Sequence, residues 1–383
     1  MPIEGAKPPV APVEDRLVLS PASFAELPGW RDDRFAEALP ALRRSCAAGV
    51  TGTPAARAAA GDLAGWRAFC GRLAALGATS DESLRAFLER ELLPFALANR
   101  REREGLLTGY YEPELRGSRR KERSFVHPLY LDPRDQMVVD LGEFERDLAG
   151  RKITGMIRGG RFRPYWDRAE IESGALRRRR LELLWVDDPV ALFFLQIQGS
   201  GRVVLPDGSL VRVGYAGQNG HDYTPIGRRL VELGEIAREQ VSLQSIRAWL
   251  RAHPERATEV MNVNRSYVFF RVLPGNAPVG ASGVELVAGR SLAVDDAFLP
   301  YGVPLWIASS FPAVPELGRV ETPFGRLMVA QDTGGAITGP VRGDLFLGPG
   351  REAEEIAGRM KQPLRAWILL PRGAATLRAA ASR

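Results

Sequence analysis

The first hundred residues carry apolar side chains at helical spacing. Three stripes recur at intervals of three and four residues, which places their members on one face of a helix. The stripes are Phe35, Leu39, Leu42 and Cys46; Trp66, Phe69, Cys70 and Leu73; and Leu84, Phe87, Leu88 and Leu92. Asp32 and Asp33 suit the start of the first helix, and Gly77 offers a carboxyl-terminal cap for the second. We expect three amphipathic helices whose apolar faces enter a core.

From about Leu106 the pattern changes to short apolar segments that are interrupted by Gly, Pro and Asp. Such segments are typical of strands in sheets and barrels. Two helical stretches remain, residues 242–253, which Pro254 ends, and a stretch around 352–360. The pattern therefore predicts a mainly β chain with N-terminal helices.

The segment FFLQIQGSG alternates apolar and polar residues, which predicts a strand. Phe193, Leu195 and Ile197 would share one face of this strand, and Gln196 and Gln198 the other. Two amides on one face suit the hydroxyl and acetamido groups of sugars. They are equally well explained as the polar side of a half-exposed strand.

Length and charge narrow the class of protein. The 383 residues suffice for two or three domains, and no apolar run reaches the roughly 18 residues that a membrane-spanning helix needs. The net charge of +6 favours polyanionic partners, such as nucleic acid or a cell-wall glycan that carries peptide carboxylates, although it also serves solubility. No aromatic-rich nucleic-acid signature accompanies the arginines, so we expect no nucleic-acid partner.

The sequence contains two cysteines and three histidines, which are too few and too scattered for a metal site. We therefore expect neither a metal nor a cofactor. Cys46 and Cys70 each lie on a helical stripe. They form either a disulfide or two buried thiols.

Asp332 lies just after a buried apolar run, residues 327–330, and just before Gly334 and Gly335. A carboxyl group at such a strand end is shielded from water on one side, which suits a general acid. The two glycines let a ligand approach the backbone closely. An aspartate in a glycine-rich turn is also a common structural feature.

Other polar groups stand in similar settings. Asp295 ends the segment SLAVD, and Asp344 follows Asp332 after a short loop. Each of these two residues is equally well explained as a turn residue. Further candidates for contacting a ligand lie in glycine-rich blocks, namely Tyr110 in TGYYEP and Asn219 and Tyr223 in GQNGHDY.

Five blocks together resemble the successive signatures of the MltA family of lytic transglycosylases. In chain order they are TGYYEP (108–113), FFLQIQGSG (193–201), YAGQNGHDY (215–223), SLAVD (291–295) and QDTGGAITGP (331–340), the last followed by Asp344. The ordered set is far more specific than any one block.

The resemblance implies a double-psi β-barrel domain formed by residues 1–112 and 257–383, with a second β-rich domain, residues 113–256, inserted into it. A groove between the two domains would bind the glycan. The catalytic role falls on Asp332, and Asp295 and Asp344 would shape its environment. The substrate-binding residues implied by the motifs are Thr108, Tyr110, Gln196, Gln198, Ser200, Asn219, Tyr223, Gly334 and Gly335.

The implied reaction cleaves the β-1,4 bond between N-acetylmuramic acid and N-acetylglucosamine in peptidoglycan. The nucleophile is the sugar's own C6 hydroxyl, so the product is a 1,6-anhydromuramic end and one carboxyl group can serve as both acid and base. An ordinary glycosidase needs two.

Family members are usually lipid-anchored in the outer membrane, which implies the periplasm for this protein as well. The segment MPIEGAKPPVAPVED has no basic region followed by an apolar core, so no signal and no acylatable cysteine are predicted in this chain. The protein is therefore cytosolic, or the sequence begins after the signal. The envelope location favours a Cys46–Cys70 disulfide, and we expect a monomer.

Two other functions compete with this interpretation. Asp332, Thr333 and Gly334 spell an aspartic protease signature, but the sequence has no second copy to supply the paired aspartate, which only a homodimer could restore. A non-catalytic barrel that binds the cell wall is the other alternative. Purified sacculi distinguish the three, because they would yield anhydromuropeptides, peptides or nothing.

Overall fold

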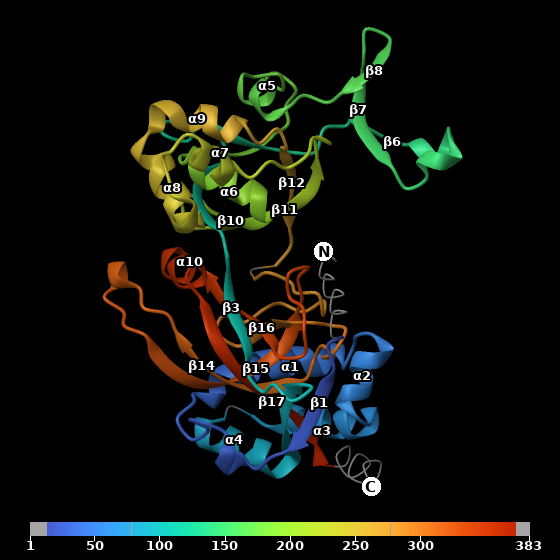
Figure 1. The fold of residues 1–383 in the computed structure, drawn as a ribbon, viewed down its shortest axis with the longest axis vertical. Coiled ribbons are helices and arrows are strands. Elements are labelled where there is room, and N and C mark those ends of the chain that lie inside the picture. Colours follow the sequence, from blue (N-terminus) through green and yellow to red (C-terminus); the bar gives the residue numbers. More distant parts are fainter. Residues whose placement is uncertain (1–13, 78, 276, 373–383) are drawn as a thin grey trace, which may run out of the picture. The chain divides into compact units, whose positions relative to one another are not determined.

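The computed structural model describes residues 14–77, 79–275 and 277–372 (Figure 1). The chain forms two compact units. Unit 1 comprises Met1–Tyr110, Val279–Gly348 and Arg359–Arg383, and unit 2 comprises Tyr111–Pro278 and Pro349–Gly358. The inserted unit therefore continues past the predicted end at residue 256, because strand β12 (Val268–Leu273) pairs with β11 (Leu210–Gln218) of the insert.

Unit 1 contains an eight-stranded sheet that closes on itself in part. Its order is β1 (Leu17–Pro21), β2 (Leu92–Asn99), β17 (Lys361–Pro371), β14 (Pro304–Phe311), β15 (Thr322–Asp332), β13 (Ser291–Val294), β16 (Arg342–Pro349) and β3 (Gly105–Glu112). Because β17 also pairs with β3, the six strands from β17 to β3 form a closed barrel. The prediction of a mainly β chain with a barrel is confirmed.

Four helices pack on this sheet: α1 (Leu39–Ala48), α2 (Pro54–Ala60), α3 (Leu63–Ala75) and α4 (Asp81–Glu91). Their apolar stripes enter the same core as the barrel, and Leu42, Phe69 and Phe87 are buried with Trp306. Cys46 of α1 and Cys70 of α3 form a disulfide, so the alternative of two free thiols is wrong.

Unit 2 contains a six-stranded sheet, a set of helices and a separate three-stranded meander. The sheet has the order β12, β11, β10 (Ser200–Val204), β4 (Glu114–Ser118), β9 (Glu182–Val186) and β5 (His127–Tyr130). The helices are α5 (Arg168–Glu172), α6 (Pro189–Gln198), α7 (Ile226–Glu232), α8 (Leu243–Ala252), α9 (Pro254–Asn262) and α10 (Arg351–Ala357). The meander consists of β6 (Met137–Asp140), β7 (Lys152–Arg158) and β8 (Arg161–Pro164).

The strand predicted for FFLQIQGSG is wrong, because most of this segment is helix α6. The side chain of Asp188 accepts hydrogen bonds from the first-turn N–H groups of Val190 and Ala191, at 2.8 and 2.9 Å. Pro189 stands at the first helical position, and Gly199 ends the helix in the left-handed conformation, with φ of 78°. The helix is buried on most sides, so its apolar residues show no helical period.

Within the described residues, no helix is long and apolar enough to cross a membrane.

The disulfide is expected to contribute to the stability of unit 1. It closes a loop with a sequence separation of 24 residues, and a loop of this size stabilises a fold by about 3 kcal/mol. We expect Cys46→Ala/Cys70→Ala to lower the free energy of unfolding by this amount in urea titrations. Reductant should have the same effect on the wild type and none on the variant. Two thiols that alkylate without reductant, in protein exported to the periplasm, would contradict the bond.

Candidate functional site

Asp332 is the last residue of β15, and its carboxylate accepts three hydrogen bonds. The Tyr110 hydroxyl donates to Oδ2 at 2.8 Å. The backbone N–H groups of Ala281 and Thr333 donate to Oδ1, at 2.9 and 3.0 Å. The residues before it, from Leu327 to Gln331, are fully buried, whereas Asp332 is partly exposed. The carboxylate is thus fixed in orientation at the surface end of a buried strand.

The segment at Gly280 reaches Asp332 because it lies directly against the backbone of β15. A Cβ added at Gly280 would be 2.4 Å from the Gln331 carbonyl oxygen, so only glycine fits without a shift. Ser282 donates from its N–H and its hydroxyl to the same oxygen, at 3.1 and 2.7 Å. This close approach brings the Ala281 N–H to the carboxylate.

Gln331 fixes the strand end from the other side. It is fully buried, and its Nε2 donates to the Ala41 carbonyl and to Ser45 Oγ of α1, at 3.1 and 2.8 Å. Its Oε1 accepts from Ser291 Oγ at 2.5 Å. Gln331 is the extra residue at the shift in register between β15 and β13, since Ala330 pairs with Leu292 and Asp332 with Ala293. The Gln331 amide points into the core, whereas Asp332 is only partly buried and accepts from the Tyr110 hydroxyl.

Asp344 and Thr108 stand beside Asp332 in the barrel. Ala293 of β13 pairs with Asp332 on one side and with Asp344 on the other, so the two aspartates are separated by about two strand spacings, roughly 10 Å. Thr108 Oγ1 donates to Asp344 Oδ1 at 2.6 Å and accepts from Arg342 Nη2 at 2.8 Å. Three predicted residues, Thr108 from one motif and Asp332 and Asp344 from another, are therefore close together.

Burial raises the pKa values of Asp344 and Tyr110. It raises the pKa of Asp344, and the charge of Asp332 acts in the same direction, while Thr108 and Arg342 oppose the shift. Burial and the neighbouring Asp332 raise the pKa of Tyr110 far above its ordinary value. Tyr110 therefore remains a neutral hydroxyl donor at any working pH.

Asp295 holds the loop that follows Asp332 through a backbone hydrogen bond. Its Oδ2 accepts from the Gly339 N–H at 2.6 Å, and its Oδ1 accepts from Ala297 N–H at 3.0 Å. Gly334 and Gly335 lie in the loop that Asp295 holds, both exposed, and a Cβ at Gly335 would meet nothing within 4 Å. This loop leaves space next to the backbone.

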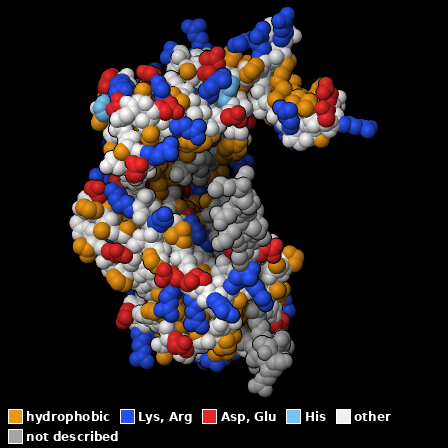
Figure 2. All heavy atoms as spheres, viewed as in Figure 1, with side chains coloured by type: hydrophobic (Ala, Val, Ile, Leu, Met, Phe, Trp, Pro, Cys, Tyr) orange, Lys and Arg blue, Asp and Glu red, His pale blue; other side chains and the backbone are white. Residues whose placement is uncertain are grey.

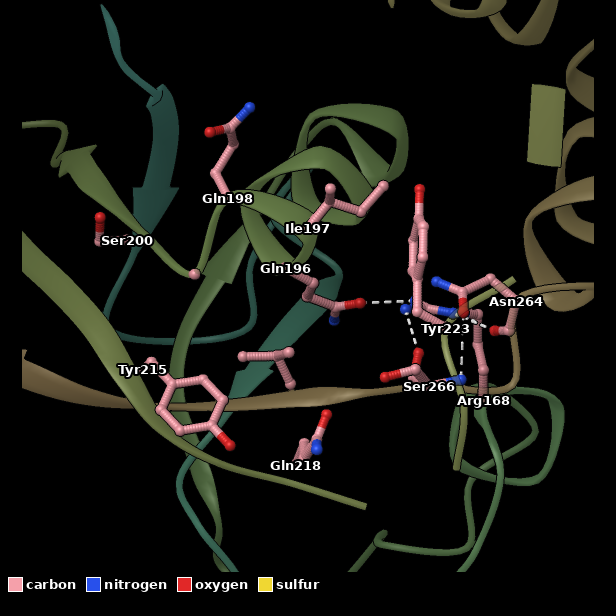
Figure 3. Close-up of a pocket in the computed structure, with 12 residues that line it drawn as sticks. Arg168, Gln196, Ile197, Gln198, Ser200, Tyr215, Gln218, Tyr223, Asn264 and Ser266 are labelled. Carbon is pink, nitrogen blue, oxygen red and sulfur yellow. Dashed lines mark hydrogen bonds between the residues drawn. The ribbon is translucent and has the colours of Figure 1, made fainter. Parts of the chain in front are cut away.

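Unit 2 contains a pocket of about 550 Å³, shown in Figure 3. Four of the predicted binding residues line it: Gln196, Gln198, Ser200 and Tyr223. Gln196 and Gln198 come from the end of α6, and Tyr215 and Gln218, which the sequence analysis did not select, come from β11. Tyr215 and Tyr223 are 49% and 54% exposed, so their rings are accessible.

Arg168 connects the segments that form the buried part of this pocket. Arg168 was not identified as a site residue from the sequence. Its buried guanidinium donates to the Asn264 and Ser266 carbonyls, at 2.9 and 2.6 Å, and to Gln196 Oε1 at 2.5 Å. Burial lowers the pKa of Arg168. The Gln196 Nε2 group is buried and makes no hydrogen bond to the described residues. The pocket thus offers exposed rings and amides, with one buried amide donor beneath them.

Asn219, which the motifs predict to contact the ligand, is buried in unit 2 and does not line this pocket. It is 0% exposed. Its Nδ2 donates to the carbonyls of Trp166 and Arg265, at 2.9 Å each, and its Oδ1 accepts from Tyr267 N–H at 2.8 Å. A fully bonded and buried amide holds a loop in place and has no group left for a sugar.

Two family models match this chain. Residues 106–271 match the MltA specific insert domain, and residues 290–370 match the 3D domain. A curated relative, membrane-bound lytic murein transglycosylase A of Escherichia coli K12, is 34% identical over 266 residues, which cover 68% of this chain and 64% of the relative. The chain therefore aligns with somewhat less than two thirds of that relative's length.

Three solved structures are similar along nearly the whole chain. The lytic transglycosylase LtgG of Burkholderia pseudomallei is 39% identical, with a TM-score of 0.68, covering 94% of this chain and 98% of that one. MltA from Neisseria gonorrhoeae is 34% identical, with a TM-score of 0.75 and coverage of 93% and 92%. E. coli MltA with bound chitohexaose is 28% identical, with a TM-score of 0.59 and coverage of 92% and 91%.

Asp344→Asn is expected to stabilise the protein at neutral pH. The folded pKa of Asp344 lies above its unfolded value. The stability linked to its proton is therefore present below the unfolded pKa, about 4, and is lost as the pH rises through the folded pKa. Asparagine carries no charge and still accepts from Thr108. The variant's gain in free energy of unfolding should appear in urea titrations at neutral pH and disappear in acid.

Asp207→Asn is the matched control, because hydrogen bonds from Ser209 lower the pKa of Asp207. This variant should gain nothing at neutral pH. An equal gain in both variants, or none in Asp344→Asn, would show that the buried charge is not what destabilises the site.

Proposed function

Since the chain belongs to the MltA family of lytic murein transglycosylases, we propose that it cleaves the glycan strands of peptidoglycan with Asp332 as general acid and base. The bond cut is the β-1,4 bond between N-acetylmuramic acid and N-acetylglucosamine, and the product is a 1,6-anhydromuramic end. The observation that carries this proposal is the fixed Asp332 carboxylate at the surface end of a buried strand, with three hydrogen-bond donors on it.

The hydrogen bonds indicate where the transferable proton resides. Two N–H donors occupy Oδ1, whereas Oδ2 accepts only from Tyr110. Since each carboxylate oxygen has two acceptor positions, Oδ2 retains one for the proton that goes to the glycosidic oxygen. The bond from C1 to that oxygen then breaks, O6 of the same sugar bonds to C1, and the O6 proton passes to Oδ2. No water is consumed.

The three donors also assist the first of the two steps. In the first step they stabilise the negative charge that Asp332 acquires as it gives up its proton. Tyr110 stays protonated throughout because its pKa is raised far above the ordinary range. A charged Asp344 would add negative potential near the oxocarbenium-like sugar, and Thr108 holds its carboxylate in that position.

We assign sugar binding to the pocket of unit 2, with Gln198, Tyr223 and Tyr215 as its exposed contacts. The similar E. coli structure with bound chitohexaose supports a chain of N-acetylated sugars as ligand. Aromatic rings suit the apolar faces of sugars, and amides suit their acetamido groups. We also propose that the barrel has double-psi topology. The protein is further proposed to be a monomer that lies in the periplasm in association with the outer membrane.

The competing functions fit the site less well. A protease of the aspartic type needs two carboxyl groups that share a proton, whereas Asp332 is bonded to a tyrosine and two backbone N–H groups. A barrel that only binds the wall does not require a carboxylate held by three donors.

Asp332→Asn is expected to abolish most activity on purified sacculi. Asparagine keeps the size of the side chain but has no transferable proton, and acid–base catalysis contributes roughly two to four orders of magnitude to the rate. The loss should lie near the upper end, because one group serves both steps. Folding and glycan binding should be retained. Asp295→Asn and Asp344→Asn should lose less, and full activity in Asp332→Asn would refute the assignment of the site.

The products test the mechanism separately. Ring closure by O6 consumes no water, so mass spectrometry of digested sacculi should show muramic ends lighter by one water than those of a lysozyme digest. Ordinary reducing ends as the main product would identify a hydrolase.

Tyr223→Ala and Gln198→Ala are expected to raise KM and leave kcat nearly unchanged. Each removes one contact to the sugar and no group that transfers the proton, which corresponds to about two- to ten-fold in KM. Leu210→Ala is the control, because Leu210 is an exposed residue of β11 that does not line the pocket. Equal KM values in all three variants would exclude the pocket as a binding site.

A further inference from the structure

Unit 1 contains a second pocket, of about 890 Å³, that the proposed catalytic mechanism does not use. The segment before α1 and the neighbouring strands β14 and β15 line it. Arg326 in this pocket and Asp332 both belong to β15, six residues apart, which corresponds to roughly 20 Å along the strand. The pocket is therefore separate from the catalytic carboxylate. Its lining includes four arginines, Arg34, Arg290, Arg319 and Arg326.

The charge of Arg290 is balanced inside unit 1. Arg290 is 1% exposed, and its Nη1 and Nη2 donate to the two carboxylate oxygens of Asp33, at 2.7 and 3.0 Å. Nη2 also donates to Glu37 Oε2 at 3.0 Å, and the other oxygen of Glu37 lies 3.5 Å from Arg34 Nη1. Asp33 further accepts from the Leu327 N–H at 2.9 Å. Both carboxylates are thus already bonded to other groups.

Arg326 has no such partner. Its side chain is half-buried and makes no hydrogen bond or ion pair within the part of the chain that the structure describes. Its guanidinium carbon lies 5.3 and 5.4 Å from the ring centroids of Phe311 and Phe324. Burial lowers the pKa of Arg326, and the charge of Arg290 acts in the same direction, while Asp33 and Glu37 oppose the shift. A guanidinium that loses hydration without gaining an anion is costly, so this position favours an anionic ligand.

The composition of the pocket selects the kind of anion. Four arginines against three acidic residues, Asp32, Asp33 and Glu37, leave a formal charge of +1, which suits one carboxylate better than a doubly charged phosphate. The planar guanidinium matches a carboxylate with two parallel N–H donors. Phe324, Pro28 and Pro323 supply apolar surface in the same pocket.

A polyanion fits this part of the molecule less well. Over unit 1, the face seen in Figure 2 has Lys and Arg interspersed with Asp and Glu. Such a surface has no broad region of one sign that would attract a polymer of many charges. The preference for an anion is therefore local to the pocket.

We propose that this pocket binds the free carboxylate at the end of a short peptide, with Arg326 as the residue that pairs with it. The carboxylate accepts from the Arg326 guanidinium, and the last side chain of the peptide packs on Phe324. Peptidoglycan carries peptide carboxylates, so the natural source of the ligand rests on the proposed function, whereas the binding itself does not. The pocket lets the protein hold a peptide of the wall while Asp332 acts on a glycan strand.

Isothermal titration calorimetry on the purified wild type tests the proposal without any substitution. The probes are acetyl-alanyl-alanine, its C-terminal amide and inorganic phosphate. The acid and the amide differ in the charge of the terminal group, so the acid should bind about ten- to hundred-fold more tightly. Phosphate should bind more weakly than the acid. The proposal fails if the acid does not bind, if the amide binds equally well, or if phosphate binds most tightly.

Arg326→Gln should weaken binding of the acid by the same factor, and Arg326→Lys, which keeps the charge but lacks the fork of donors, should have an intermediate effect. Arg158→Gln is the matched control, because Arg158 of unit 2 also lies over a ring, that of Trp166 at 4.3 Å, but does not line this pocket. It should bind the acid like the wild type. Thermal unfolding should show that all variants are folded.

Wild-type affinity for the acid in Arg326→Gln would overturn the proposal. It would do so even if this variant were less stable, since Arg326 would then only hold the two phenylalanine rings. The titration measures binding and not turnover. Protein that binds the peptide but leaves sacculi uncut would therefore contradict the proposed function alone, and protein that cuts sacculi without binding the peptide would contradict this inference alone.

Discussion

The side-chain amide of Gln331 is fully buried, and all its hydrogen-bonding groups are satisfied inside unit 1. It bonds to α1 through Ala41 and Ser45 and to β13 through Ser291. A buried amide without these partners would cost about 1–3 kcal/mol for each unsatisfied group, so the end of β15 has one favourable position. This anchor also restrains Asp332, because the two residues are adjacent in the chain and Asp332 pairs with Ala293 of β13. The disulfide at Cys46 lies next to Ser45 and thus restrains the same helix.

The site itself combines groups that a stable core would avoid. Asp344 is half-buried with its pKa raised, and it stands within electrostatic reach of Asp332. Thr108 and Arg342 offset only part of the cost of burying this charge. The surrounding barrel tolerates the cost because its strands bury a continuous apolar core. Such a local loss of stability is common where chemistry requires charged groups in a dry setting.

How much the sequence predicts depends on how local the determining interactions are. Asp332 was identifiable because an apolar run before it and two glycines after it are adjacent in the chain. The helical stripes of the first hundred residues were readable for the same reason. Helix α6 was not, since burial on most sides erased its period, although Asp188, Pro189 and Gly199 mark its ends. The burial of Asn219 was not predictable, because a polar residue in a glycine-rich loop looks the same in sequence whether it contacts a ligand or the backbone.

Arg168 and the meander of unit 2 show the limit of local patterns. The guanidinium of Arg168 bonds to carbonyls 96 and 98 residues away, so nothing near it in sequence predicts its burial. In β7, apolar side chains occur on both faces, since Ile153 and Ile157 project to one and Met156 to the other. Only the register with β6 and β8 shows that the first face gathers apolar residues from three strands while the second contacts the core. Surface chemistry of this kind is therefore a property of strand pairing, and it becomes readable once the pairing is known.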